Sequence, residues 1–467
     1  MDRKTLLLDW IDTNKRDFHI LSDLIWENPE LSMQEYFAAE QIIKLLEEKG
    51  FTVQKAVSGL PTAFIATYGS GRPVVGFSSE YDALPGLSQK NDSNEFDPII
   101  PLAPGHGCGH NLLAATGIMA ATALKNLMDK ENITGTIKVF GTPAEELCIG
   151  KPFMAKDGFF NGVDAFFDWH PSHQNKCGAC YTNAYFNVKY HFKGKTAHGN
   201  SPWQGISAMD SAMLMAHGIE LLREHIKPGP EEAANTINYS FPESGNNIPN
   251  VVPDKATLWC VARLNSTEMA KEVLQKVNAC AAGSAMSTGT ELDIEILTAT
   301  HNMIPNIKLS SLCEENLRFI GLPQFTEEDQ KVVKALQSSM NADKKEFKNE
   351  IVPIELGWAP VTDASEYSWH APIALINLAV TPSPDTGWHN WVSTRVSGSD
   401  IGKKVMVVAA KTLSCSAYDL IVRPEILDEA TAEFRERLGG RVYESLIPVG
   451  TVPDLSINSD IMRKFRR

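Results

Sequence analysis

Short apolar segments alternate with a long helical stretch between residues 61 and 172, and this alternation restricts the fold more than any other feature. The segments "PTAFIATYG", "RPVVGFSSEYDALPG", "TIKVFGTPAEE" and "VDAFFDWHPS" end in polar or Gly/Pro-rich turns, and "LLAATGIMAATALKNLMDK" separates the second from the third. Strands that alternate with helices form largely parallel sheets covered by helices. We therefore predict a doubly wound α/β domain, preceded by two amphipathic helices within the first fifty residues.

A different order of elements occupies residues 184–300. Here strand and helix patterns follow one another as β-α-β-β-α-β, which is the order of a ferredoxin-like module. The α/β pattern then resumes with the strand "IALINLAV" and the helix "VMVVAAKTL". With 467 residues the chain exceeds one ordinary core. We predict two domains, an α/β domain made of residues 1–183 and 301–467 and an inserted α+β domain of residues 184–300, with a final helix and an irregular tail from "EFRERLGG" onward.

Charge and hydropathy exclude several classes of protein. The chain carries 43 basic and 57 acidic residues, a net charge of -14, and its basic residues form no long run, which argues against a nucleic-acid partner. The N-terminal apolar run is only three leucines long before Asp9, too short for a secretory signal. No window offers roughly eighteen uncharged apolar residues for a membrane span. A cytoplasmic protein without a membrane partner is expected.

Polar side chains with metal-binding or acid–base chemistry follow the predicted strands. Cys108 and His110 lie in "GHGCGH", immediately before the long helical stretch. The adjacent Glu145 and Glu146 follow "KVFGTPA", and His170 follows "AFFDW". His389 lies beyond "IALINLAV". Because the carboxyl ends of parallel strands share one edge of a sheet, these segments are expected to meet there.

Each of these residues alone has an ordinary structural explanation, but together they form a ligand set. One thiolate, three imidazoles and one carboxylate suffice for two metal ions with open positions for water and substrate. The set is Cys108, His110, Glu146, His170 and His389. Neighbouring residues in an extended loop point apart, so Glu145 is left to face the substrate as a proton shuttle.

Six motifs identify the chain with a known family. "GHGCGH", "TPAEE", "DWHPS", "GKTAHG", "NIPNVVPDKATLWCVAR" and "TGWHNW", in this order, resemble the metal-dependent peptidases and amidohydrolases that include aminoacylases, glutamate carboxypeptidases and auxin-conjugate hydrolases. The branch with cysteine in its metal site, to which the B subunits of aminobenzoyl-glutamate hydrolases belong, is most similar. The resemblance implies hydrolysis of an amide bond in an N-acyl amino acid or dipeptide-like substrate. It also implies two divalent metal ions per subunit, zinc or manganese, held by the five ligands, with Glu145 as the general base.

The resemblance also implies roles for the inserted domain, which serves as lid and dimerisation domain in the family. His198, in "GKTAHG", corresponds to a histidine that reaches the active site of the partner subunit in a homodimer. Asn250 and Arg263 correspond to the residues that hold the substrate carboxylate, for which a guanidinium is well suited. Whether a companion A subunit is required stays open, as does the choice between an acidic and a basic substrate side chain.

Two positions depart from the patterns of relatives. Glu80 stands where many relatives carry the histidine of an H-x-D motif, and Asn111 stands where the cysteine branch usually has an aspartate after "CGH". An amide cannot carry the charge that orients a neighbouring imidazole, so Asp82 and Asp363 are expected to support the site instead. His106 is expected to make a loop hydrogen bond or a substrate contact and is not counted as a ligand.

Other interpretations of the cysteines remain at this point. Cys108 with His110 or His170 would also suit a cysteine-nucleophile hydrolase, and the site would also suit a protein that binds metal without catalysis. Cys177 and Cys180 form a C-x-x-C, but a zinc ribbon needs a second pair and a redox motif should open a helix. We interpret that pair as a loop with two thiols.

Overall fold

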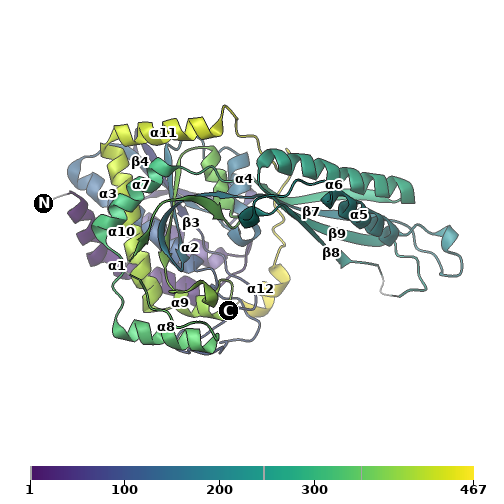
Figure 1. Ribbon diagram of the computed structural model, residues 1–467, viewed down its shortest axis with the longest axis horizontal. Coiled ribbons are helices and arrows are strands. Elements are labelled where there is room, and N and C mark those ends of the chain that lie inside the picture. Colours follow the sequence, from purple (N-terminus) through teal and green to yellow (C-terminus); the bar gives the residue numbers. More distant parts are fainter. Residues whose placement is uncertain (1–2, 246–247, 349, 467) are drawn as a thin grey trace.

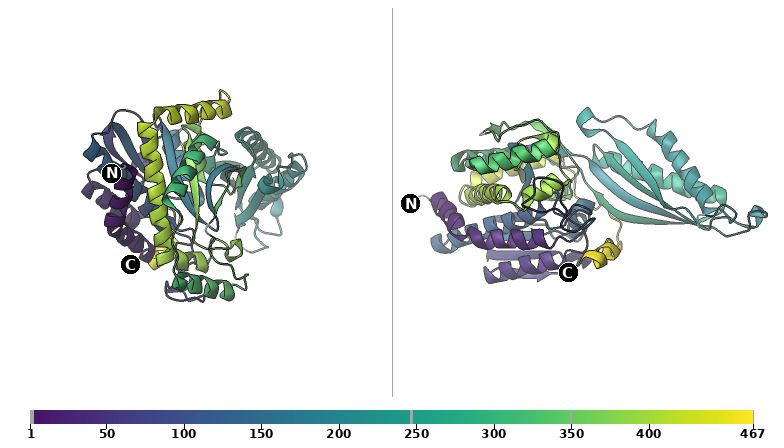
Figure 2. Two further views of the ribbon diagram at one scale, coloured as in Figure 1. Left: turned by 60° about the vertical axis from the view of Figure 1, so that its left-hand side comes forward. Right: turned by 90° about the horizontal axis from the view of Figure 1, so that it is seen from below.

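The protein has two lobes, each built around its own sheet (Figure 1). This is a computed structural model, and it describes residues 3–245, 248–348 and 350–466. The larger lobe contains a nine-stranded sheet with helices on both faces, and the smaller, elongated lobe contains a four-stranded sheet. Figure 2 shows the smaller lobe extending from one end of the larger.

The nine-stranded sheet is largely parallel where the polar clusters lie. Its order is β1-β2-β4-β3-β5-β13-β6-β11, with β12 also paired to β6. The pairs β4–β3, β3–β5 and β5–β13 are parallel, so the carboxyl ends of these four strands share one edge. This confirms the predicted α/β class. The strands are β1 (Thr52–Lys55), β2 (Phe64–Ser70), β3 (Val74–Ser79), β4 (Gly135–Gly141), β5 (Ala165–Ser172), β6 (Asn175–Thr182), β11 (Ile351–Val352), β12 (Leu356–Ala359) and β13 (Ile373–Ala379).

Helices bury both faces of this sheet. The helix α3 packs on β3 and contacts both α1 and α10. α10 is long and apolar enough to cross a bilayer, but 83% of its most apolar window is buried, which is typical of a core helix. The helices of this lobe are α1 (Arg3–Glu27), α2 (Tyr36–Glu48), α3 (His110–Glu131), α4 (Gly150–Lys156), α7 (Ile307–Ile320), α8 (Glu327–Ser339), α9 (Trp391–Ser397), α10 (Asp400–Val422), α11 (Pro424–Leu438) and α12 (Ser459–Phe465).

The smaller lobe has the predicted ferredoxin-like order. Its elements are β7 (Ala184–Lys193), α5 (Ala208–Arg223), β8 (Thr236–Glu243), β9 (Lys255–Leu264), α6 (Thr267–Thr288) and β10 (Glu291–Thr300). The strands form an antiparallel sheet in the order β10-β7-β9-β8. Phe186, Val188 and Tyr190 alternate along β7 and are buried in the core that the sheet forms with α5 and α6. This burial of every second residue agrees with the period of two that a strand has.

Two local expectations were wrong, the loop at Cys177 and Cys180 and the irregular tail. Cys177 and Cys180 lie within β6 and not in a loop. The apolar residues that follow them belong to two strands, β6 and β7, which lie in different sheets and separate at Asn183. Hydrophobic periodicity continues across this junction, so it could not mark the break. The irregular tail also contains a helix, α12, and the segment before it accepts hydrogen bonds from Gln34 through the carbonyls of Leu455 and Ile457.

Candidate metal centre

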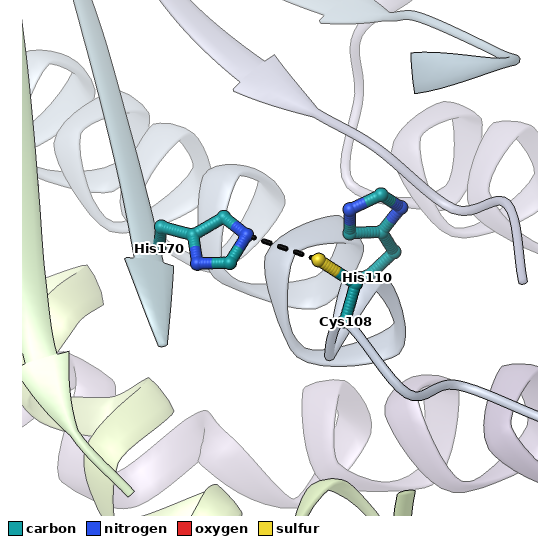
Figure 3. A group of neighbouring side chains, drawn as sticks. All are labelled: Cys108, His110 and His170. Atoms are coloured by element: carbon teal, nitrogen blue, oxygen red, sulfur yellow. Dashed lines mark hydrogen bonds between the residues drawn. The ribbon is translucent and has the colours of Figure 1, made fainter. Parts of the chain in front are cut away.

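All five predicted ligands meet at the carboxyl edge of the parallel strands. The Sγ atom of Cys108 lies 3.3 Å from Nε2 of His170, which stands near the end of β5 (Figure 3). Nε2 of His389 lies 3.4 Å from Oε2 of Glu146, and Nε2 of His110 lies 3.9 Å from Oε1 of the same carboxylate. Segments that are far apart in the sequence therefore bring sulfur, nitrogen and oxygen donors to one place.

The donors form three overlapping groups, two of which share one thiol, while Glu80, His110 and Glu145 make the third. Cys108, His110 and His170 make the first group, and Cys108, Glu146 and His389 make the second. In each group the ligand atoms lie within 4.8 Å of one another, which is close enough to surround one ion. Cys108 belongs to two of the groups, so its thiol could contribute to holding a metal ion in either of them.

The glycines of "GHGCGH" allow this close approach. Gly109 precedes α3 with φ +79°, in the left-handed region, and a Cβ atom there would lie 2.8 Å from the Pro171 side chain at the end of β5. At Gly105 a Cβ atom would lie 2.0 Å from the carbonyl oxygen of Leu87. Only glycine fits these two positions without displacing its neighbours. The glycines thereby allow Cys108 and His110 to lie close to β5.

The two adjacent glutamates lie in a tight 3-10 turn, Glu145–Leu147, and not in the extended loop that we expected. Ala144 and Cys148, on either side of the turn, both adopt left-handed backbone conformations. The buried carboxylate of Glu35 stabilises the first of these by accepting a hydrogen bond from the Ala144 amide at 2.8 Å. Left-handed conformations of residues other than glycine cost energy and concentrate at functional sites. Here they direct both carboxylates of the turn toward His110 Nε2, at 3.8 and 3.9 Å.

Asp82 orients His110. Its Oδ1 lies 2.9 Å from Nδ1 of His110, and its Oδ2 accepts hydrogen bonds from the Ser32 hydroxyl and the Glu146 amide. Burial alone would raise the pKa of the Asp82 carboxyl. The hydrogen bond and charge of His110 outweigh burial, so the pKa lies below its usual value and the carboxyl stays ionised. With Nδ1 held by Asp82, Nε2 is the atom directed at the other donors. Asn111 takes no part, because its amide binds Ser22 and Ser397.

The environment of these donors fits a cation. His110 Nε2 and Glu146 Oε1 are buried and have no hydrogen-bond partner among the described residues, although buried polar atoms rarely lack one. Burial raises the pKa of Glu146 to about 8 and also raises the pKa of the Cys108 thiol. Burial lowers the pKa of His170 to about 4, which leaves that imidazole neutral at pH 7. A metal ion would satisfy the orphaned atoms and stabilise the anionic forms of both acids.

Sequence reasoning did not identify the buried cation beside this centre. Lys151, in the first turn of α4, is fully buried, and its Nζ lies 2.7 Å from Oε1 of Glu80 and also binds Asp363. Asp363 was expected to support the site, and it contacts this lysine. The sequence does not indicate that a single lysine after a loop is buried, because lysines are mostly exposed.

The remaining predicted site residues lie outside this cluster. His198 and Asn250 are exposed neighbours in the smaller lobe, where the Gly199 amide donates to the Asn250 carbonyl at 2.7 Å. Arg263 is exposed on β9, with its guanidinium 5.6 Å from the centre of the Tyr185 ring. Within the described part of the chain, none of the three contacts the Cys108 cluster. His106 is buried and its Nε2 lies 3.1 Å from the Ile25 carbonyl, so it makes the loop hydrogen bond.

Loss of the Asp82 carboxylate is expected to weaken metal binding. We predict that Asp82→Asn lowers the affinity for zinc about 10- to 100-fold, the usual effect of removing the partner that orients a ligating histidine. Titration with zinc against a competing chelator measures this. Asp293→Asn, at an exposed position of β10, is the control and should bind zinc as the wild type does. Unchanged affinity in Asp82→Asn would show that Asp82 does not position a ligand.

Comparison with known proteins agrees with this geometry. Residues 76–414 match peptidase family M20/M25/M40. The chain is 30% identical to the p-aminobenzoyl-glutamate hydrolase B subunit of Escherichia coli, an alignment that covers 95% of this chain and 97% of that protein. It is 29% identical to the Xaa-Arg dipeptidase of Mus musculus, over 92% and 91% of the two chains. The crystal structure of an aminobenzoyl-glutamate utilization protein from Klebsiella pneumoniae shares the fold, with a TM-score of 0.56 and 17% identity over 88% of this chain and 97% of that one.

Proposed function

The chain belongs to peptidase family M20/M25/M40 and is a metal-dependent hydrolase of amide bonds, and we propose that it cleaves an N-acyl amino acid or a dipeptide-like substrate with a free carboxylate. The observation that carries this proposal is the meeting of five metal-binding side chains with the neighbouring carboxylate of Glu145. Two divalent ions, zinc or manganese, would be held by Cys108, His110 and His170 on one side and by Cys108, Glu146 and His389 on the other.

Glu145 supplies the acid–base chemistry in this proposal. Bound metal ions would polarise the scissile carbonyl and lower the pKa of a water molecule, so that the water can attack the carbonyl carbon as it gives up a proton. Glu145 takes the proton of that water at Oε2, the oxygen that faces His110, and later delivers it to the leaving amine. Burial and the neighbouring charge of Glu80 raise the pKa of Glu145, which suits a group that must accept a proton and then release it.

The names of the relatives guide the choice of substrate. One relative acts on p-aminobenzoyl-glutamate and another is an Xaa-Arg dipeptidase, so both names place an amino acid on the leaving side of the amide bond. We propose p-aminobenzoyl-glutamate as the first substrate to test, with dipeptides ending in arginine or lysine as the competing set. Arg263 and Asn250 are proposed to bind the α-carboxylate when the smaller lobe closes on the larger.

The free carboxylate of the substrate is expected to be essential to fast turnover. Because a hydrogen bond to a charged group contributes about 1.5–3 kcal/mol, kcat/KM for the free acid should exceed that for its amide about 10- to 100-fold. Arg263→Ala should erase most of this preference, and Arg318→Ala, on the surface of α7, should leave it intact. Hydrolysis rates on the paired substrates measure both effects. If the wild type hydrolyses the acid and the amide at equal rates, Arg263 does not bind the substrate carboxylate.

We also propose that two copies associate through the smaller lobe and that His198 contributes to the active site of the partner. Met213, Leu214 and Leu221 are exposed on α5, and β8 pairs with only one strand among the described residues. Exposed apolar side chains beside an open strand edge favour a protein partner. A companion A subunit is the alternative, since a relative of that name is 26% identical to part of this chain. Light scattering on the purified chain distinguishes a homodimer from a protein that needs the A subunit. We also propose that the protein is cytoplasmic.

A cysteine-nucleophile mechanism is less consistent with the site. A catalytic cysteine needs a lowered thiol pKa in an electropositive and accessible environment. Burial and the charges of Glu146 and Glu145 raise the pKa of Cys108 instead. Without a bound cation this thiol would stay protonated, so Cys108 suits a metal ligand better than a nucleophile.

A further inference from the structure

Thr362 touches the carboxylate that the proposed mechanism uses as its base. Its hydroxyl donates a hydrogen bond of 2.7 Å to Oε1 of Glu145, from a position 217 residues later in the chain. The other oxygen, Oε2, lies 3.8 Å from Nε2 of His110. The hydrogen bond thus distinguishes the two oxygens of one carboxylate, because it occupies Oε1 and leaves Oε2 directed at the ligand cluster.

Thr362 is itself held in place by the segment that it begins. Its Oγ1 accepts a hydrogen bond from the Ala364 amide and so caps the 3-10 helix Asp363–Trp369, all of whose residues are buried. A hydroxyl that accepts from one partner can direct its single proton to another, here Glu145. Asp363, the next residue, is fixed by the buried Lys151.

The far end of the same helix is attached to the segment that leaves the smaller lobe after β10. Glu366 binds His301 at 2.8 Å, the Ser368 hydroxyl accepts from the Ile304 amide at 2.9 Å, and the Trp369 indole donates to the Asn302 carbonyl at 2.8 Å. With both ends attached, the helix has little freedom to move. Thr362 therefore presents its hydroxyl from a rigid support.

We propose that Thr362 is a positioning residue that selects Oε2 of Glu145 as the proton acceptor. The inference rests on the proposed role of Glu145 as the general base. Without the hydroxyl the carboxylate can rotate, and the oxygen that meets the attacking water is no longer fixed. The loss should therefore appear in the chemical step and not in substrate binding.

The test compares Thr362→Val with Thr362→Ser. Valine keeps the shape of the side chain but removes the hydroxyl, so kcat should fall about 10- to 100-fold, the loss expected for one hydrogen bond to a charged group. KM and the metal content should stay close to the wild-type values, and serine should restore most of the turnover. Thr326→Val, which removes the equivalent capping hydroxyl of α8 far from Glu145, is the matched control and should leave kcat unchanged. Thr362→Ala takes the place of the valine variant if that variant does not fold.

A second comparison separates positioning from a merely structural role. In a Glu145→Asp background the shorter side chain draws the carboxylate away from Thr362, so Thr362→Val should have little additional effect. Additive losses, a serine variant as slow as the valine variant, or a valine variant as fast as the wild type would each overturn the inference. Full activity of Glu145→Gln would overturn the proposed function and this inference together, whereas an inactive Glu145→Gln with a fully active Thr362→Val would overturn the inference alone.

Discussion

Glu145→Gln is expected to lower turnover by about 10²- to 10⁴-fold, the range for loss of general acid–base catalysis, while bound metal stays at the wild-type amount. Glutamine keeps the size of the side chain and can still bind the Thr362 hydroxyl through its amide oxygen, but it cannot accept the proton of water. Oε1 of Glu145 is held by Thr362. The residue shares a third donor group with Glu80 and His110 but belongs to neither group that contains Cys108, to which the two ions are assigned, so the bound metal should not depend on its charge. Steady-state kinetics and metal analysis of the same preparation measure both quantities.

The adjacent Glu146 supplies the matched control for this prediction. Glu146→Gln changes the same functional group one residue later, but this carboxylate lies between His110 and His389. The variant should lose metal as well as activity. If Glu145→Gln loses the metal and Glu146→Gln keeps it, the two roles have been assigned the wrong way round.

The composition of the cluster was predictable because its parts follow from the strand pattern. Glu146 and His389 come after strands of the parallel set and His170 lies near the end of one, and parallel strands bring their carboxyl ends together whatever their distance along the chain. "GHGCGH" added Cys108 and His110 through the loop that enters α3. The ferredoxin-like order of the smaller lobe was predictable for a similar reason, since period-two and helical patterns follow one another there in the order β-α-β-β-α-β.

The groups that support the cluster were not predictable in the same way. Lys151 acts through contacts with Glu80 and Asp363, and Thr362 acts through a contact with Glu145. Neither residue type stands out in its own segment. Asp82 could be suggested only because Asn111 lacked a charge, and its bond to His110 became evident from the fold. Contacts between distant loops depend on how the loops pack, which periodicity does not describe.

The second large effect is expected from removal of the metal. Chelation should abolish turnover, because Cys108, His110, Glu146, His170 and His389 provide donors but no nucleophile once the ions are gone. The apoprotein should stay folded, since the two lobes have large hydrophobic cores of their own. Addition of zinc or manganese should restore turnover in proportion to the metal that rebinds.

Metal content and amide hydrolysis, measured together on one preparation during chelation and reconstitution, test the account most directly. We predict close to two bound ions per chain in the active enzyme, a parallel loss of metal and activity, and a parallel recovery, with the metal protecting Cys108 from iodoacetamide. Full activity in the metal-free protein, abolished by iodoacetamide, would contradict the account and identify Cys108 as a nucleophile.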